Sequence, residues 1–249
     1  MTCNAVEIHN LHFAYPESSY PLFNGLYLSI RQGERFGLFG PNGAGKTTLI
    51  SLITGVLKAQ AGEIKIMGTP IETSNAKKHF GFVPQELAFY PELTPLENLR
   101  FFGAWANMHP DEIHTRSLEV LNILGLLAYK DKPVRQFSGG MKRRLNLAIG
   151  VIHNPAIIFL DEPTTGVDVQ TRHAILRYLL DLNSRGTTLV YTSHLLKEAE
   201  ELCEEIALMD QGTILTQGKL TELVTEHAEH GLESLFLKLT GKAYRDGYV

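Results

Sequence analysis

Cysteine is scarce in this chain of 249 residues, which contains two cysteines, Cys3 and Cys203. The separation of these two cysteines matches no metal-ligand spacing, and two cysteines cannot form the disulfide framework of a small secreted protein. We therefore expect a protein of a reducing compartment, without a cysteine-based metal site.

Long hydrophobic runs are missing as well, although 44% of the residues are hydrophobic. No stretch approaches the roughly 18 to 20 apolar residues of a membrane span. The longest apolar stretch, 145–160, is interrupted by His153, Asn154 and Pro155. The N-terminal sequence MTCNAVEIHN lacks the apolar core of a secretion signal. We therefore expect any membrane role to come through a partner.

An excess of positive charge is also lacking, because the net charge is −4 and the pI is about 6.2. The densest basic cluster, Lys142-Arg143-Arg144, is too short to form the basic stripe typical of nucleic-acid binders. We therefore expect no nucleic-acid partner.

The length and the apolar content suffice for one sizeable core, or for one core with a smaller lobe.

The order of the apolar runs indicates an α/β protein with a mostly parallel sheet covered by helices. Between about residues 93 and 152, apolar residues recur at helical spacing, which predicts a helical insertion. A turn is expected at Asp210-Gln211-Gly212, and short helices after Lys219. Strands are predicted at 6–15, 26–30, 35–40, 63–67, 79–83, 156–160, 187–192, 204–209 and 213–218, and helices at 45–55, 169–183 and 195–203.

The stretch GPNGAGKT follows the apolar run RFGLF and precedes a predicted helix. It matches G-x-x-x-x-G-K-[ST], in which a glycine-rich turn points backbone N–H groups at phosphates and the next helix adds its positive dipole end. Lys46 can reach the β- and γ-phosphates, and the Thr47 hydroxyl suits Mg²⁺. The nucleotide-binding residues predicted here are Gly40, Pro41, Asn42, Gly43, Ala44, Gly45, Lys46, Thr47 and Thr48.

Polar side chains follow three other predicted strands. They are Gln85 after HFGFV, Asp161 and Glu162 after AIIFL, and His194 after TTLVYT. Ligands of open α/β sheets bind beyond the carboxyl ends of the strands, so parallel strands would bring these groups to the edge that carries the phosphate loop. Asp161 suits Mg²⁺, through water, and Glu162 is placed to polarise the attacking water. Gln85 can orient water or bind the metal, and His194 can donate to the γ-phosphate.

Residues Ser138-Gly139-Gly140 come directly before a helix that we expect to begin at Met141. Serine is a favourable N-cap. The two glycines are harder to explain, because each weakens a helix start by about 1 kcal/mol relative to Ala. Something must therefore approach this backbone closely.

Together these stretches resemble the ATP-binding cassette (ABC) family over nearly the whole chain. GPNGAGKT is similar to the Walker A motif, IIFLDE to Walker B with its catalytic glutamate, and FSGGM to the signature LSGGQ. In the signature, Phe137 and Met141 replace the usual Leu and Gln, and Met141 lacks the amide contacts of a glutamine. The other matching residues are Tyr15 for the aromatic that stacks on adenine, Gln85 for the Q-loop, Asp168 for the D-loop and His194 for the switch histidine.

The resemblance implies a P-loop NTPase (RecA-like) core with a mostly parallel sheet, an antiparallel β subdomain and an inserted α-helical subdomain. It implies one ABC ATPase domain over residues 1–249 that binds and hydrolyses ATP with Mg²⁺. The nucleotide-binding core is then expected at about 1–85 and 155–218, the helical signature subdomain at about 86–154, and a helical tail at 219–249.

The family works as a head-to-tail dimer in which each ATP lies between the Walker motifs of one subunit and the signature of the other. The resemblance therefore implies that Ser138, Gly139 and Gly140 contact ATP held by a second copy or a homologous subunit. Closing and opening of the dimer move a separate transmembrane permease. The chain is then expected on the cytoplasmic face of the membrane, where its aromatic-rich segment after Gln85 docks the permease.

The stretches TTGVDVQTR, KRR and SLFLKLTGKAYRD look most like the ATPases of ABC-2 type exporters. Two alternatives stay open. One is a non-transport single-cassette ATPase, such as an iron–sulfur assembly ATPase, which a soluble assembly partner would favour. The other is a nucleotide-dependent scaffold that does not hydrolyse ATP, and the intact Glu162 and His194 argue against it.

Overall fold

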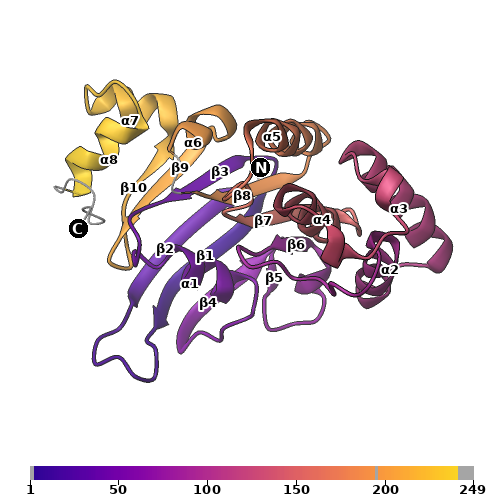
Figure 1. Ribbon diagram of the computed structural model, residues 1–249. Coiled ribbons are helices and arrows are strands. Elements are labelled where there is room, and N and C mark those ends of the chain that lie inside the picture. Colours follow the sequence, from indigo (N-terminus) through magenta and orange to yellow (C-terminus); the bar gives the residue numbers. More distant parts are fainter. Residues whose placement is uncertain (1–2, 194–195, 241–249) are drawn as a thin grey trace. The chain divides into compact units, whose positions relative to one another are not determined.

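The computed structural model describes residues 3–193 and 196–240 (Figure 1). The chain divides into two compact units. The first combines the residues up to His79 with those from Thr188 onward, and the second runs from Phe80 to Thr187. The expected division into core, helical subdomain and tail stays a prediction.

An antiparallel sheet forms one part of the first unit, with the strand order β2-β1-β4-β5. Its strands are β1 (Asn4–Phe13), β2 (Phe23–Arg31), β4 (Ala61–Ile66) and β5 (Thr69–Pro70). Along β2, buried Leu26, Leu28 and Ile30 alternate with more exposed neighbours. Such an alternation of buried and exposed side chains is typical of a strand in a sheet that has one face packed against a core.

The first unit also contains a group of strands around β3 (Arg35–Phe39). Strands β8 (Thr188–Thr192) and β9 (Glu205–Asp210) both run parallel to β3, and β10 (Thr213–Lys219) pairs antiparallel with β9. All five residues of β8 are buried, as expected for a strand covered on both faces. The helices of this unit are α1 (Lys46–Ile53), α6 (Leu196–Leu202), α7 (Leu220–Glu226) and α8 (Leu232–Thr240), with a 3₁₀ turn at Ala76–Lys78.

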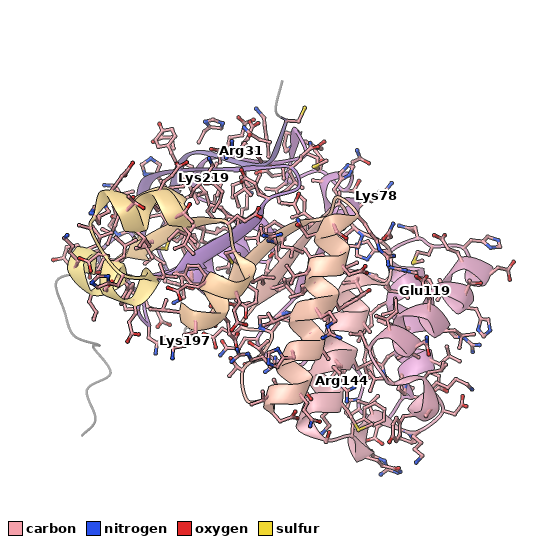
Figure 2. The ribbon with its side chains drawn as sticks, turned by 90° about the horizontal axis from the view of Figure 1, so that it is seen from above. Arg31, Lys78, Glu119, Arg144, Lys197 and Lys219 are labelled. Carbon is pink, nitrogen blue, oxygen red and sulfur yellow. The ribbon has the colours of Figure 1, made fainter. Side chains whose placement is uncertain are left out.

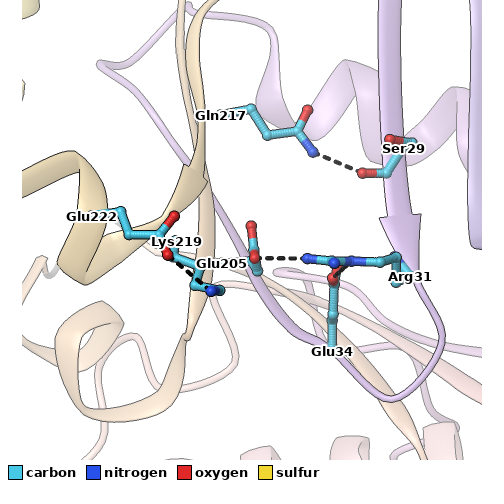
Figure 3. Close-up of polar contacts among 7 residues, drawn as sticks. All are labelled: Ser29, Arg31, Glu34, Glu205, Gln217, Lys219 and Glu222. Atoms are coloured by element: carbon cyan, nitrogen blue, oxygen red, sulfur yellow. Dashed lines mark hydrogen bonds and ion pairs between the residues drawn. The ribbon is translucent and has the colours of Figure 1, made fainter. Parts of the chain in front are cut away.

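Polar contacts join the antiparallel sheet to β9 and β10 (Figure 3). Arg31 pairs with Glu34 and donates from Nη2 to Glu205 at 2.8 Å. Gln217 donates to the backbone carbonyl of Ser29 at 2.7 Å. Burial raises the pKa of Glu205, as does the nearby charge of Glu34. These contacts tie the two groups of strands within the first unit.

The second unit pairs β6 (Phe80–Val83) in parallel with β7 (Ile157–Asp161). Figure 2 shows its side chains, with Arg144 of α4 and Glu119 of α3 labelled. Thr94 caps α2 in a capping box with Glu97, and α2 packs against α3. The helices are α2 (Pro95–Trp105), α3 (Pro110–Ile123), α4 (Gly139–Val151) and α5 (Val169–Ser184), with 3₁₀ turns at Leu127–Tyr129 and Val134–Gln136.

The structure confirms the predicted α/β class, including parallel strands, an antiparallel sheet and helices between β6 and β7. The predicted start of the signature helix at Met141 is wrong, because α4 already begins at Gly139. Ser138 is its N-cap and accepts a bond from the N–H of Met141, which draws both glycines into the first turn. Within the described part of the chain, no helix is both long and apolar enough to span a bilayer.

Candidate nucleotide site

The phosphate loop connects β3 to α1 in the first unit. Gly43 and Gly45 have φ angles of 79° and 105°, in the region that favours glycine. A side chain on Gly45 would also approach the Phe23 ring at 3.1 Å. Behind the loop, the N–H of Gly212 donates to the carbonyl of Ala44 at 2.9 Å, so the predicted turn before β10 supports this loop. The phosphate loop therefore forms a tight arc of backbone between β3 and α1.

Lys46 turns back over this arc and is only 8% exposed. Its Nζ donates to the carbonyl of Gly40 at 2.8 Å and to that of Pro41 at 3.1 Å. The residue before α1 is Gly45, which has no side chain to cap the first N–H groups of the helix. A cation and a helix N-terminus thus meet at one loop, which is the arrangement that binds phosphates.

Tyr15 lies beside the start of α1, because its hydroxyl forms a 2.8 Å hydrogen bond with Oγ1 of Thr48. Its ring packs edge-on against Phe13 at 5.0 Å and remains 44% exposed. The hydroxyl of Thr48 is therefore engaged by Tyr15, whereas Thr47 is exposed. Stacking of Tyr15 on adenine stays a prediction, and the exposed ring next to the phosphate loop is compatible with it.

In the second unit, the structure brings Gln85 and Glu162 together. Gln85 follows β6, and its Nε2 donates to Oε2 of Glu162 at 3.3 Å. Thr165 donates from Oγ1 to the same oxygen at 2.9 Å. Glu162 itself has a φ of 49°, an uncommon conformation for a glutamate. Backbone strain of this kind clusters at functional sites.

Asp161 ends β7 and is 3% exposed, so its carboxylate lies at the carboxyl end of the strand. In the first unit, the end of β8 pairs alongside β3, with Thr192 opposite Leu38. Ser193, which directly follows β8, therefore lies at the edge where the phosphate loop begins. His194 lies outside the described residues, so its predicted role stays a prediction.

The two signature glycines have different surroundings. A Cβ on Gly139 would meet nothing within 4 Å, whereas one on Gly140 would lie 2.9 Å from Oγ1 of Thr171. Gly140 is therefore explained by packing between α4 and α5 within this chain. No such packing explains Gly139 among the residues that the structure describes, and its contact with a group outside the chain stays a prediction.

Asp168 is the N-cap of α5. Its Oδ1 accepts from the backbone N–H of Thr171 and its Oδ2 from the Thr171 hydroxyl, each at 2.9 Å. These two bonds lower the pKa of Asp168. The carboxylate thus stabilises the start of α5. Its D-loop role stays a prediction, and it does not conflict with the role as N-cap.

Sequence reasoning missed Thr165 as a partner of Glu162. The available signal was a hydroxyl three residues after a carboxylate in a short loop, a spacing at which side chains of turns often meet. It also missed Arg143 and Asn146, which contact the loop after β6. Those contacts join distant parts of the sequence, so no local pattern reveals them.

Comparisons with known proteins show the family of this chain. A family model described as "ABC transporter" matches residues 23–165, more than half of the chain. The linearmycin resistance ATP-binding protein LnrL of Bacillus subtilis (strain 168) is 42% identical over 220 residues, which cover 88% of this chain and 70% of that protein. The Nod factor export ATP-binding protein I of Ralstonia nicotianae is 39% identical over 222 residues, covering 88% and 68%.

A solved structure also superimposes on this fold. It is a dimeric post-hydrolysis state of an ATP-binding cassette bound to ADP and Pi. Its TM-score is 0.79 at 28% sequence identity, and the match covers 86% of this chain and 98% of that one.

Proposed function

Since this chain belongs to the ABC transporter family and is one of its ATP-binding, ATP-hydrolysing subunits, we propose a role for each of its site residues. The phosphate loop from Gly40 to Thr48 holds the triphosphate with backbone N–H groups, with Lys46 on the β- and γ-phosphates. Tyr15 stacks on the adenine. The observation that carries this proposal is the ammonium of Lys46 held within the loop by two carbonyls.

Mg²⁺ is the metal that the available donors fit. The exposed hydroxyl of Thr47, the carboxylate of Asp161 and the amide oxygen of Gln85 are hard oxygen ligands, which Mg²⁺ prefers together with water and substrate phosphates. When bound, the metal neutralises charge on the phosphates. Thr47 and Gln85 would hold it directly, and Asp161 through water.

Glu162 polarises the attacking water, and its base assistance contributes about 10²- to 10⁴-fold to the rate. The side chains of Gln85 and Thr165 fix the orientation of its carboxylate. His194 donates to the γ-phosphate, and Asp168 lies near the nucleotide of the closed dimer.

The active form is a head-to-tail dimer with a second copy or a homologous subunit. Ser138, Gly139 and Gly140 then contact the γ-phosphate held by the partner, with the first turn of α4 adding its dipole. The open space beside Gly139 supports this assignment, because no described residue outside its own helix turn would meet a Cβ there within 4 Å. The dimeric cassette that resembles this fold supports it too.

The dimer drives a transmembrane permease, and the chain acts from the cytoplasmic face of the membrane. Tyr90, Phe101 and Trp105 are 47%, 46% and 78% exposed in the helical part of the second unit, and such apolar exposure is typical of a docking surface. The names of the relatives, which concern linearmycin resistance and Nod factor export, support an exporter over an assembly ATPase.

The test of the phosphate loop is Lys46→Ala, compared with Lys78→Ala, an exposed lysine of the same unit. We expect Lys46→Ala to weaken binding of a fluorescent ATP analogue or to slow ATP hydrolysis by at least about 10-fold, because a charged contact to phosphate is lost. Lys78→Ala should match the wild type. Unchanged affinity and rate in Lys46→Ala would refute the assignment of this loop.

A further inference from the structure

Two side chains of α4 hold the loop that follows β6. Arg143 donates from Nη1 to the backbone carbonyl of Gln85 at 2.7 Å. Asn146, which is 2% exposed, accepts from the N–H of Ala88 at 3.0 Å and donates to the carbonyl of Pro84 at 3.1 Å. The backbone on both sides of Gln85 is therefore attached to the helix that begins in the signature.

The other arm of the Arg143 guanidinium reaches the loop after β7. Its Nη2 donates to the backbone carbonyl of Thr165 at 3.3 Å. Gln85 and Thr165 are also the residues whose side chains donate to Oε2 of Glu162. One guanidinium thus binds the backbones of two residues whose side chains contact this carboxylate.

The charge of the guanidinium strengthens these bonds. Burial lowers the pKa of Arg143, and the charge of Glu162 opposes that shift. The guanidinium remains charged at neutral pH, because its ordinary pKa is above about 12. Hydrogen bonds from a charged donor are about twice as strong as neutral ones. A shorter or single-headed side chain would release one loop or both.

We propose that Arg143 is a positioning residue for Glu162, acting through the backbones of Gln85 and Thr165. The inference rests on the proposed function, because it takes Glu162 as the group that polarises water. Without the guanidinium, the carboxylate is present but displaced. A displacement of about 1 Å in a reacting group can lower the rate by about 10²-fold.

The experiment compares Arg143→Ala and Arg143→Lys with Arg144→Ala. Arg144 is the next residue of α4 and donates from Nη1 to the carbonyl of Leu124 at 2.8 Å, so it controls for loss of charge and for loss of a helix anchor. We expect Arg143→Ala to lower kcat by about 10- to 10²-fold while KM and ATP affinity stay within about two-fold. Arg143→Lys keeps the charge but lacks the fork of the guanidinium that reaches two separate loops, so it should fall between Arg143→Ala and the wild type. It also keeps the test informative if Arg143→Ala does not fold.

Single-turnover measurements on Glu162→Gln, alone and combined with Arg143→Lys or Arg143→Ala, complete the test. If Arg143 acts through the carboxylate, its substitution slows the Glu162→Gln protein by less than about two-fold. Equal fractional losses in both backgrounds would overturn the positioning role, as would a loss of kcat that Arg144→Ala reproduces. If Glu162→Gln itself turns over like the wild type, the proposed role of Glu162 fails, and this inference fails with it.

Discussion

At the scale of single residues, His153 links stability to pH. It is half-buried after the end of α4, and its Nε2 lies 3.1 Å from the carbonyl of Phe80. Burial lowers the pKa of this imidazole below its usual 6.5, although the bond to Phe80 opposes the shift. The folded protein therefore binds this proton less tightly than the unfolded chain does.

Because the unfolded chain takes up the proton first, stability falls as the pH drops below about 6.5, until the folded imidazole also titrates. The matched variant is His153→Gln, which keeps an N–H donor for Phe80 and does not titrate. Between about pH 7.5 and about pH 5.5, we expect the urea midpoint of the wild type to fall relative to that of the variant. A difference that stays constant over this range would contradict the assignment.

The sequence alone points to the phosphate loop and the two carboxylates as candidate site residues, because they lie in short local motifs, and their roles stay predictions. The backbone conformation of Glu162 could not be predicted from the sequence. Its φ of 49° costs of order 1–3 kcal/mol, which contacts from the surrounding loops must offset. Those contacts include Thr165 and the loop around Gln85, whose path depends on α4.

At the scale of elements, α4 connects the signature to other parts of the second unit. It begins in the signature, and Arg144 ties it to the end of α3 through the carbonyl of Leu124. Its apolar spacing predicted a helix correctly, and its first residue was misplaced because two glycines were taken as non-helical. Ser138 supplies a cap strong enough to include them.

The two glycines of α4 allow a matched pair of substitutions. A Cβ at position 139 meets no described atom within 4 Å outside its own helix turn, so we expect Gly139→Leu to leave the thermal midpoint and ATP binding unchanged and to impair ATP-driven dimerisation. Gly140→Leu would press on Thr171 and disturb the cap that Asp168 gives α5, with a loss of stability of about 1–3 kcal/mol. Thermal unfolding and size-exclusion chromatography with light scattering measure both effects. Dimerisation of Gly139→Leu at wild-type strength would refute the proposed contact.

At the scale of the whole molecule, each compact unit carries a different part of the chemistry. The first unit holds the phosphate loop and Tyr15, and the second holds Gln85, both carboxylates and the signature. The order of most strands and helices could be predicted, because short apolar runs bounded by turns alternate with stretches of helical spacing. The short β5 could not, since two residues give no periodic pattern.

The central claim, taken for a second copy as the partner, is that ATP joins two copies of this chain and that Glu162 drives the hydrolysis of ATP. The most direct measurement is light scattering of purified Glu162→Gln with ATP, alongside its rate of phosphate release. We predict hydrolysis slower by about 10²-fold or more, and a dimer that forms with ATP and is absent with ADP. Hydrolysis at the wild-type rate, or a monomer at saturating ATP, would contradict the account.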